Sequence, residues 1–172
     1  MEERKGAVTF KGKPLTLIGP ELKVGQAGPD CELVGNDLST VRLSDFAGKV
    51  RVIASVPSLD TPVCDTETRR FNVAAGELGA DVKVLTVSMD LPFAQARWCG
   101  AAGVDNVVTL SDHRAAAFGT AYGVLIKRLR LLGRAVFVLD REGIIRYLQL
   151  VREMSDEPDY DSALKAVKAL VV

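Results

Sequence analysis

Residues 50–78, VRVIASVPSLDTPVCDTETRRFNVAAGEL, run from an apolar strand through a proline-led bend into an amphipathic helix. Pro57 ends the strand, because proline lacks an amide hydrogen and fixes φ, so the chain leaves the sheet there. The bend delivers Cys64 to the first turn of the predicted helix. At that position unpaired backbone N–H groups and the positive end of the helix dipole favour an anion. The stretch therefore predicts a strand–helix unit that presents a cysteine suited to a thiolate.

The same alternation of strand and helix continues along the chain. VKVLTVS (82–88) precedes PFAQARWCGAAG (92–103), and the short segment NVVTL (106–110) precedes SDHRAAAFGTAYG (111–123). Strands that alternate with helices indicate βαβ units and a parallel core.

Two hairpins are predicted before this core. The segment AVTFKGKPLTLIG (7–19) has alternating apolar residues on both sides of Gly12–Lys13, which suits a tight turn with glycine at the first turn position. CELVGNDLSTVRL (31–43) repeats the pattern around Asn36–Asp37. We therefore expect antiparallel β-structure at the front of the chain.

The C-terminal third predicts an antiparallel pair and a closing helix. RAVFVLD (134–140) and IIRYLQL (144–150) flank the turn REG, and DYDSALKAVKALVV (159–172) follows. Apolar residues recur in that last segment at the helical spacings of three and four: Tyr160, Leu164, Val167 and Val171. Together these elements predict a thioredoxin-like α/β fold, with a central mixed sheet flanked by helices and an added N-terminal β-hairpin.

Length, composition and charge limit the number of domains and the classes of partner. The 172 residues are 48% hydrophobic, which suits one well-cored domain over residues 1–172. Lys plus Arg and Asp plus Glu both number 22, so no basic excess is available for nucleic acid. No apolar run approaches the ~20 residues that cross a bilayer, and the first residues lack a signal-peptide core. We expect no membrane partner and a cytoplasmic location.

Cys64 is reactive only when its thiolate is populated, and an ordinary thiol with a pKa of about 8.5 is mostly protonated at neutral pH. Thr61, three residues earlier, is placed to share the pocket of Cys64. Its hydroxyl can donate to a thiolate or accept from the O–H of a substrate. Asp65 acts in the opposite direction, because an adjacent carboxylate disfavours a second negative charge. A cation must therefore outweigh Asp65.

Three arginines are candidates for that cation. Arg69 and Arg70 lie one to two turns along the helix and fit its solvated face. Arg134 opens the apolar strand AVFVL, where a partner at the edge of the core explains a cation better than solvent alone. Each residue also has a plain structural alternative: Pro57 as a strand terminator, Thr61 as an N-cap and Arg134 as a solvated strand end. The residues alone leave these alternatives open.

PSLDTPVC (57–64) carries the pattern Pro-x-x-x-Thr-x-x-Cys and resembles the active-site signature of the peroxiredoxin family. Its PS-x-DT-x-VC form is similar to the thiol peroxidase subgroup, the atypical two-cysteine type. The resemblance covers nearly the whole chain, because further segments match the subgroup in the same order: LSDFAGK (43–49), LPFAQARWCGAAG (91–103), AYGV (121–124), GRAVFVLD (133–140) and EPDYDSAL (157–164).

The resemblance implies a thiol-dependent peroxidase that reduces hydrogen peroxide and organic hydroperoxides to water and alcohols. It makes Cys64 the peroxidatic cysteine, Thr61 and Arg134 its activating partners, and Pro57 the residue that shields the pocket. Cys99, in RWCG, becomes the resolving cysteine, which forms an intramolecular disulfide with Cys64. The resemblance also implies thioredoxin or a similar dithiol as the reductant and a homodimer as the working state. We expect no metal or organic cofactor, because the O–O bond of the substrate drives the chemistry.

Cys99 lies near the end of the helix predicted at 92–103, before Gly100 and Gly103, which are plausible helix stops. A disulfide requires Cα atoms within about 7 Å, and two cysteines on different packed helices rarely satisfy this in a resting fold. We therefore expect the first turn of the Cys64 helix, or the end of the Cys99 helix, to unwind locally before the disulfide closes.

The remaining thiol and the one histidine have simpler interpretations. Cys31 stands in GPDC, where the family usually has an aromatic residue, so a buried small hydrophobe is favoured over a second resolving cysteine. His113 follows Ser111–Asp112, which resemble a helix start, and fits a surface helix position better than a Cys-His pair. No paired Cys-x-x-Cys spacing supports a zinc site.

Two other functions compete with a peroxidase. A thiol-disulfide oxidoreductase of the same fold is disfavoured, because the helix start lacks Cys-x-x-Cys. A redox sensor or holdase-type binding protein, in which Cys64 oxidises slowly and the disulfide changes a binding surface, is the hypothesis from another class. Turnover separates a sensor from a peroxidase, since a peroxidase consumes many peroxide molecules per chain and a sensor stops near one.

Overall fold

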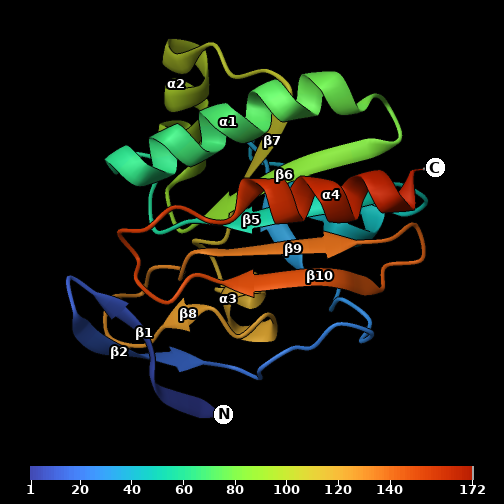
Figure 1. The fold of residues 1–172 in the computed structure, drawn as a ribbon. Coiled ribbons are helices and arrows are strands. Elements are labelled where there is room, and N and C mark those ends of the chain that lie inside the picture. Colours follow the sequence, from blue (N-terminus) through green and yellow to red (C-terminus); the bar gives the residue numbers. More distant parts are fainter. Residues whose placement is uncertain (172) are drawn as a thin grey trace.

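The computed structural model describes residues 1–171 and contains two β-sheets (Figure 1). The larger sheet has seven strands in the order β10-β9-β5-β6-β7-β3-β4, and the smaller has three in the order β1-β2-β8. The strands are β1 (Glu3–Phe10), β2 (Lys13–Ile18), β3 (Glu32–Val34), β4 (Thr40–Arg42), β5 (Val50–Ser55), β6 (Val82–Ser88), β7 (Val107–Ser111), β8 (Leu125–Ile126), β9 (Ala135–Leu139) and β10 (Ile145–Leu150).

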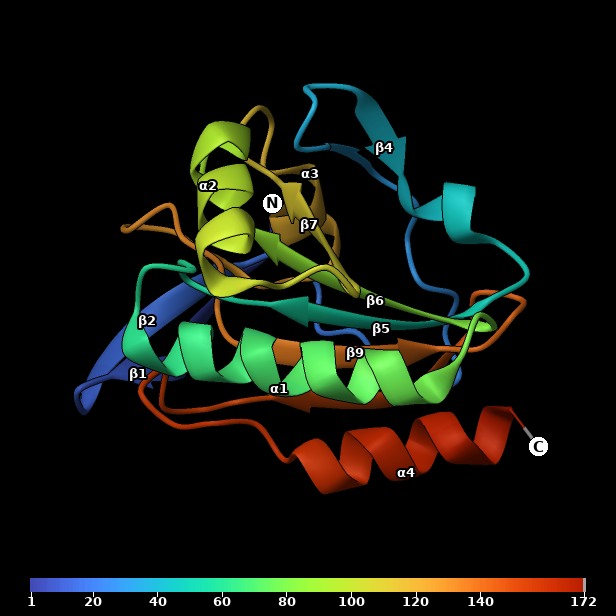
Figure 2. The same ribbon diagram turned by 90° about the horizontal axis from the view of Figure 1, so that it is seen from above.

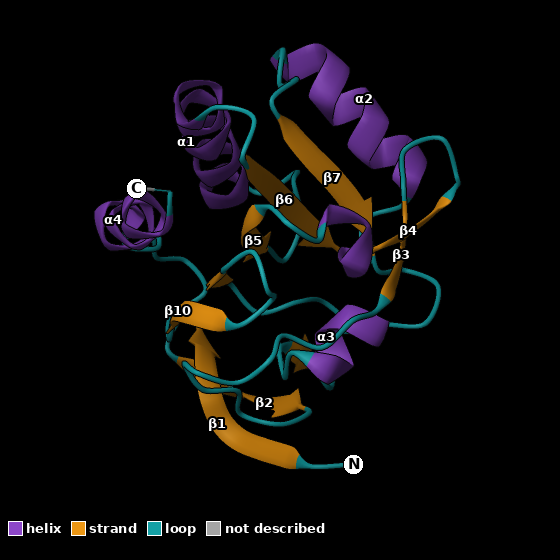
Figure 3. Ribbon diagram, turned by 90° about the vertical axis from the view of Figure 1, so that its right-hand side faces the viewer, coloured by secondary structure: helices purple, strands orange, loops and turns teal. Residues whose placement is uncertain are grey.

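The helices are unequally divided between the two faces of the large sheet. They are η1 (Leu43–Phe46), α1 (Pro62–Leu78), α2 (Pro92–Ala102), α3 (Ala117–Ala121) and α4 (Tyr160–Leu170). Helices α1, α2 and α4 cover one face, whereas α3 and the small sheet lie against the other (Figures 1 and 3). Among residues 1–171, no helix is long and apolar enough to cross a bilayer.

Alternation along the central strands creates two hydrophobic cores. On β5, Val52 and Ala54 pack with Phe71 of α1, whereas Ile53 points to the opposite face and packs with Phe118 of α3. Side chains of a strand alternate between the two faces, so a continuous apolar run fills both cores. Full burial of a side chain the size of Val52, Ile53 or Phe71 stabilises the fold by about 1.5–3 kcal/mol.

The ends of four strands meet at one edge of the large sheet. Strands β5, β6 and β7 are parallel neighbours, so their carboxyl ends lie at the same edge (Figure 2). Strand β9 runs antiparallel to β5, with Ala135 opposite Ser55. Arg134, which precedes β9, is therefore brought beside the loop that follows β5, although the two are far apart in sequence.

The N-terminal hairpins form, but their turns differ from the expectation. Phe10 pairs with Lys13, so the first turn consists of Lys11 and Gly12 rather than Gly12 and Lys13. Both turn residues have positive φ, which matches the twist of a two-residue hairpin and places glycine at the second turn position. The second hairpin encloses Asn36–Asp37 in a longer loop.

The helix expected within 111–123 is mostly wrong, because only Ala117–Ala121 is helical. Ser111 ends β7, and the half-buried His113 lies in a turn, so the surface-helix prediction for His113 is also wrong. The buried carboxylate of Asp112 accepts hydrogen bonds from the amides of Phe118 at 3.0 Å and Gly119 at 2.8 Å. These bonds stabilise a turn ahead of the helix.

Candidate active site

The loop after β5 is held by a carboxylate from the end of the neighbouring strand. Asp90, just beyond β6, accepts hydrogen bonds from Ser58 Oγ at 2.7 Å and from the Leu59 amide at 2.9 Å. Pro57 is buried where the loop leaves the sheet. The parallel pairing of β5 and β6 places the two strand ends side by side, so the sheet itself fixes the shape of the loop.

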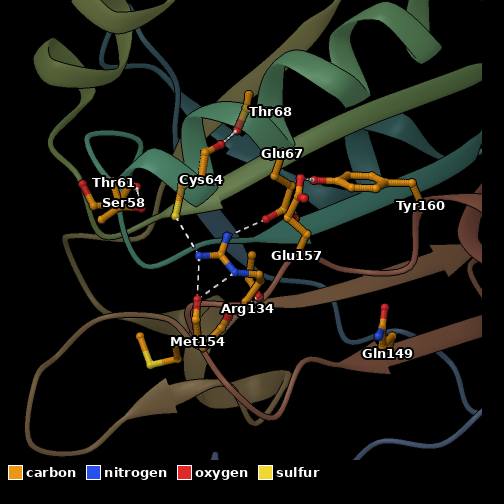
Figure 4. Close-up of polar contacts among 12 residues, drawn as sticks. Ser58, Thr61, Cys64, Glu67, Thr68, Arg134, Gln149, Met154, Glu157 and Tyr160 are labelled. Atoms are coloured by element: carbon orange, nitrogen blue, oxygen red, sulfur yellow. Dashed lines mark hydrogen bonds and ion pairs between the residues drawn. The ribbon is translucent and has the colours of Figure 1, made fainter. Parts of the chain in front are cut away.

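Cys64 lies in the first turn of α1, as expected, and its side chain is buried. Pro62 occupies the start of the helix, where its missing amide hydrogen costs no intrahelical bond. The sulfur of Cys64 accepts a hydrogen bond from Arg134 Nη2 at 3.3 Å (Figure 4). The structure therefore places a buried guanidinium directly against the thiol.

Arg134 is fixed in that position by every arm of its guanidinium. Nε and Nη2 donate to the carbonyl of Met154 at 3.1 and 2.9 Å, and Nη1 donates to Glu67 Oε2 at 2.6 Å (Figure 4). Arg134 and Glu67 are both buried. The solvated strand end considered for Arg134 is therefore excluded, and the partner at the edge of the core is present.

Burial and neighbouring charge have opposite effects on the pKa values of Glu67 and Arg134. Burial raises the pKa of Glu67 to about 7, although the neighbouring guanidinium of Arg134 works to lower it. Burial also tends to lower the pKa of Arg134, but Cys64 and Glu67 beside it outweigh that effect and raise it. For Glu67 the rise in pKa caused by lost hydration exceeds the fall caused by one neighbouring cation. Arg134 has two neighbours that favour its charged form, and together they outweigh the effect of its burial.

Thr61 is the N-cap residue of α1, yet its side chain makes no cap hydrogen bond within the described chain. Its Oγ1 instead donates to the Ser58 carbonyl at 3.0 Å. The hydroxyl proton is thereby committed to the loop, so Oγ1 offers a lone pair rather than a donor. Of the two uses expected for this hydroxyl, acceptance from a substrate O–H is the one that this geometry favours.

A mostly apolar cavity of about 360 Å³ opens beside Arg134. Pro57, Thr61 and Arg134 contribute to its wall, so three of the predicted site residues share one cavity. The other lining residues come from the first hairpin, the start of α1, the segment after β8 and the loop before α4: Phe10, Lys11, Pro62, Val63, Leu129, Leu131, Met154 and Ser155. Cys64 is fully buried behind this wall and does not itself line the cavity. A larger groove of about 460 Å³ between α1 and α4 is lined by neither Cys64 nor Arg134.

Cys99 does not lie among the residues that surround Cys64 and Arg134. It is half-buried on α2, and its sulfur lies 3.5 Å from Thr109 Oγ1 of β7. Helix α2 continues through Gly100 and ends at Ala102 with Gly103 as its C-cap, so only the second of the two expected helix stops is confirmed. All three cysteines are free thiols in residues 1–171.

Cys31 is a buried residue of the core beside α3, as its interpretation as a small hydrophobe predicted. Burial raises the pKa of its thiol to about 12, with Asp112 and Asp30 adding to the effect. Within the described residues, no group of three or more His, Cys, Asp or Glu side chains is arranged to hold a metal ion.

Arg69 and Arg70 lie on the solvent side of α1, as expected. Arg69 pairs with Asp65, its Nε donating to Oδ2 at 2.9 Å, and Arg70 stacks 3.8 Å from the ring centroid of Tyr160. The charge of Asp65, which was expected to oppose a thiolate at Cys64, is therefore partly balanced by Arg69.

Comparison with known proteins places the chain in a family. The family model described as Redoxin matches residues 23–164. A thiol peroxidase from Bacillus subtilis (strain 168) is 56% identical over 164 residues, which cover 95% of this chain and 98% of the relative. A thiol peroxidase from Oceanobacillus iheyensis is 57% identical over 157 residues, covering 91% and 95%. The chain belongs to the Redoxin family, in its thiol peroxidase subgroup.

Solved structures confirm the thioredoxin-like peroxiredoxin fold of this Redoxin-family chain. A peroxiredoxin-like protein from Aquifex aeolicus has a TM-score of 0.90 at 46% identity, covering 96% of this chain and 97% of the other. A thiol peroxidase from Chromobacterium violaceum has a TM-score of 0.84 at 23% identity, covering 94% and 95%, and so shares the fold.

Sequence reasoning missed three groups in this Redoxin-family site. They are the Glu67 carboxylate, the Asp90 carboxylate and the Met154 carbonyl. A signal existed for Asp90, because it follows a strand parallel to the one before Pro57, and such strand ends meet at one edge. Glu67 also had a signal, since it lies three residues after Cys64 and so on the same face of α1. Nothing in the local sequence identified the carbonyl of Met154.

Proposed function

We propose that this chain reduces hydroperoxides with Cys64 as the peroxidatic cysteine, in keeping with the thiol-dependent peroxide reduction of its family. The Cys64 thiolate attacks the terminal oxygen of ROOH, an S–O bond forms and the O–O bond breaks. Cys64 becomes a sulfenic acid and is oxidised by two electrons, while RO⁻ leaves and takes up a proton to give water or an alcohol. The 3.3 Å contact between Arg134 Nη2 and Cys64 Sγ carries this proposal.

Each of the other site residues has one role in this step. Arg134 stabilises negative charge on the sulfur and on the oxygen that departs, because a fixed buried cation loses little energy to reorganisation. Thr61 Oγ1 accepts from the hydroperoxide O–H and so orients the terminal oxygen. Pro57 forms a wall of the cavity and limits the access of water to the sulfur.

The cavity also bears on the substrate. Its wall contains Phe10, Leu129 and Leu131, and a volume of about 360 Å³ leaves room for an alkyl or aryl group attached to the peroxide. We propose that the enzyme accepts hydrogen peroxide and organic hydroperoxides, with the apolar wall binding the organic part.

In the second step Cys99 resolves the sulfenic acid. Its thiolate attacks the sulfur of Cys64, an S–S bond forms, the S–O bond breaks and water leaves after protonation. Thioredoxin or a similar dithiol then reduces the Cys64–Cys99 disulfide. We propose a homodimer as the working state, as the family resemblance implies, and the cytoplasm as the location, because a reducing compartment supplies the dithiol.

The test is a coupled assay of NADPH consumption with thioredoxin, thioredoxin reductase and either hydrogen peroxide or cumene hydroperoxide. Wild type should turn over many times, and both Cys64→Ser and Cys99→Ser should lose the coupled cycle. Cys99→Ser should still react once with peroxide, whereas Cys64→Ser should not. A wild type that stops after one equivalent would instead support the redox-sensor hypothesis.

A further inference from the structure

Asp65 links the two helices that carry the reactive cysteines. Its Oδ1 accepts a hydrogen bond from Trp98 Nε1 of α2 at 3.0 Å, and its Oδ2 accepts one from Arg69 Nε at 2.9 Å. Arg69 also donates to the carbonyl of Ala102, the last residue of α2, at 3.2 Å, and lies 5.7 Å from the ring centroid of Trp98. We call Asp65, Arg69 and Trp98 the α1–α2 clasp.

The other end of α2 is anchored independently of the clasp. Pro92 and Gln95 are the buried residues of this helix. Gln95 Nε2 donates to Ser88 Oγ and to the carbonyl of Leu110, both at 2.9 Å. Beyond Trp98 the helix contains Gly100, which is exposed and disfavours helix. Helix α2 therefore has a first half anchored by buried hydrogen bonds and a second half held by the half-buried packing of Trp98 and Ala102 together with the clasp.

Cys99 lies in the second half of α2, so the difference between the two halves bears on disulfide formation. Its sulfur faces Thr109 of β7, whereas the sulfur of Cys64 faces Arg134. Trp98, the residue before Cys99, packs against the cluster that contains Cys64. The two sulfurs therefore face different partners in the resting fold, and a movement of the second half of α2 towards Cys64 would break the clasp contacts and leave those of Gln95 in place.

We propose that Asp65 is a positioning residue for disulfide formation: through Arg69 and Trp98, it holds the Cys99 half of α2 folded, and opening of this clasp sets the rate of resolution. The inference rests on the proposed function, in which Cys99 attacks the Cys64 sulfenic acid. The closed clasp keeps Cys64 in its folded pocket for reaction with peroxide, and the open clasp releases Cys99.

The clasp thereby controls a competition at the sulfenic acid. In one branch the Cys99 thiolate displaces hydroxide from Cys64, giving a disulfide and water. In the other branch a second ROOH transfers its terminal oxygen to the Cys64 sulfur, which becomes sulfinic acid while ROH leaves. A longer-lived closed clasp favours the second branch, because only resolution requires α2 to open.

The experiment measures both branches in reduced protein mixed with cumene hydroperoxide, by acid quench and mass spectrometry of the sulfenic acid, disulfide and sulfinic acid. Trp98→Phe removes the indole donor and keeps an aromatic ring. Arg69→Met removes the ion pair and the bond to Ala102. Arg70→Met is the matched control, because it removes the same charge from the next residue of α1, whose contact is with Tyr160 of α4.

We expect the rate constant for conversion of sulfenic acid to disulfide to rise roughly five- to tenfold in Trp98→Phe and in Arg69→Met, where tenfold corresponds to about 1.4 kcal/mol. The peroxide concentration that gives half over-oxidation should rise by a similar factor. Arg70→Met should stay within twofold of wild type in both quantities. Circular dichroism at the assay temperature should give the same helix content in all four proteins before peroxide is added.

Unchanged or slower disulfide formation in both clasp variants would overturn the inference, and so would an equal acceleration in Arg70→Met. These outcomes differ from a failure of the proposed function. If Cys99 is not the resolving cysteine, wild type itself forms no Cys64–Cys99 disulfide after peroxide, whatever the clasp does.

Discussion

Glu67 Oε2 lies 2.6 Å from Arg134 Nη1, and both side chains are buried. This contact fixes one arm of the guanidinium whose other arm reaches Cys64. The carbonyl of Met154 accepts hydrogen bonds from Nε and from the same Nη2 that reaches Cys64. The cation beside the thiol therefore has its orientation set before any substrate arrives, which is the condition for effective electrostatic stabilisation.

Arg134→Met should slow sulfenic acid formation by roughly a hundredfold or more, since loss of one fixed charge-stabilising donor typically costs about 10²–10³ in rate. Single-turnover kinetics with hydrogen peroxide measures this step directly. Because Arg134→Met leaves Glu67 unpaired, which can cost about 3–5 kcal/mol of stability, the control is Arg134→Met combined with Glu67→Gln. Near-normal rates in the folded double variant would show that another cation activates Cys64.

Glu67 should make stability depend on pH in a specific direction. Its pKa is raised by burial from 4.5 to about 7, so the folded state binds a proton that the unfolded state has released between those values. Its contribution to stability is therefore greatest at low pH and is lost as pH rises towards 7. Glu67→Gln keeps the shape and removes the titration.

Urea unfolding of wild type and Glu67→Gln at pH 5 and pH 8 measures that contribution. The free energy of unfolding of the variant should improve relative to wild type as pH rises. A relative gain by wild type instead would mean that Arg134 depresses the pKa of Glu67 and that the ion pair outweighs the cost of burial.

Thr61→Ser should retain most of the activity, whereas Thr61→Val should lose roughly tenfold in kcat/KM, because one hydrogen bond contributes about 1 kcal/mol or somewhat more. Valine keeps the branched shape and removes the hydroxyl. The coupled peroxidase assay with both substrates gives the comparison. Equal activities in the two variants would refute a role for Oγ1 in orienting the hydroperoxide.

Leu129→Ser should raise the KM for cumene hydroperoxide by roughly tenfold, because it removes apolar wall worth about 1–2 kcal/mol. The KM for hydrogen peroxide should change little. Leu38→Ser is the control, since Leu38 is similarly exposed, at 48% against 43% for Leu129, but lies outside the cavity. A similar change of KM for the two peroxides in Leu129→Ser would argue against an organic-group subsite.

The alternation of strand and helix and the placement of Cys64 were predictable, because each depends on local rules of periodicity and helix starts. For Arg134 the residues left two interpretations open, a partner at the edge of the core or a solvated strand end, and only the family resemblance assigned it to Cys64. The partner Glu67 was not identified, because this pairing depends on how the start of α1 lies against Arg134, the residue that precedes β9. The error at His113 has a similar origin: the hydrogen bonds of Asp112 stabilise a turn where the local pattern favoured helix.

Trp98 is an intrinsic fluorescence probe of the contact between α1 and α2. It is the chain's single tryptophan, it adjoins Cys99, and its half-buried indole is bonded to Asp65 across the two helices. Loss of that bond and entry of water should shift its emission to longer wavelength. The opening of α2 can then be timed in a stopped-flow fluorimeter from the intrinsic fluorescence of the unlabelled enzyme in a single turnover.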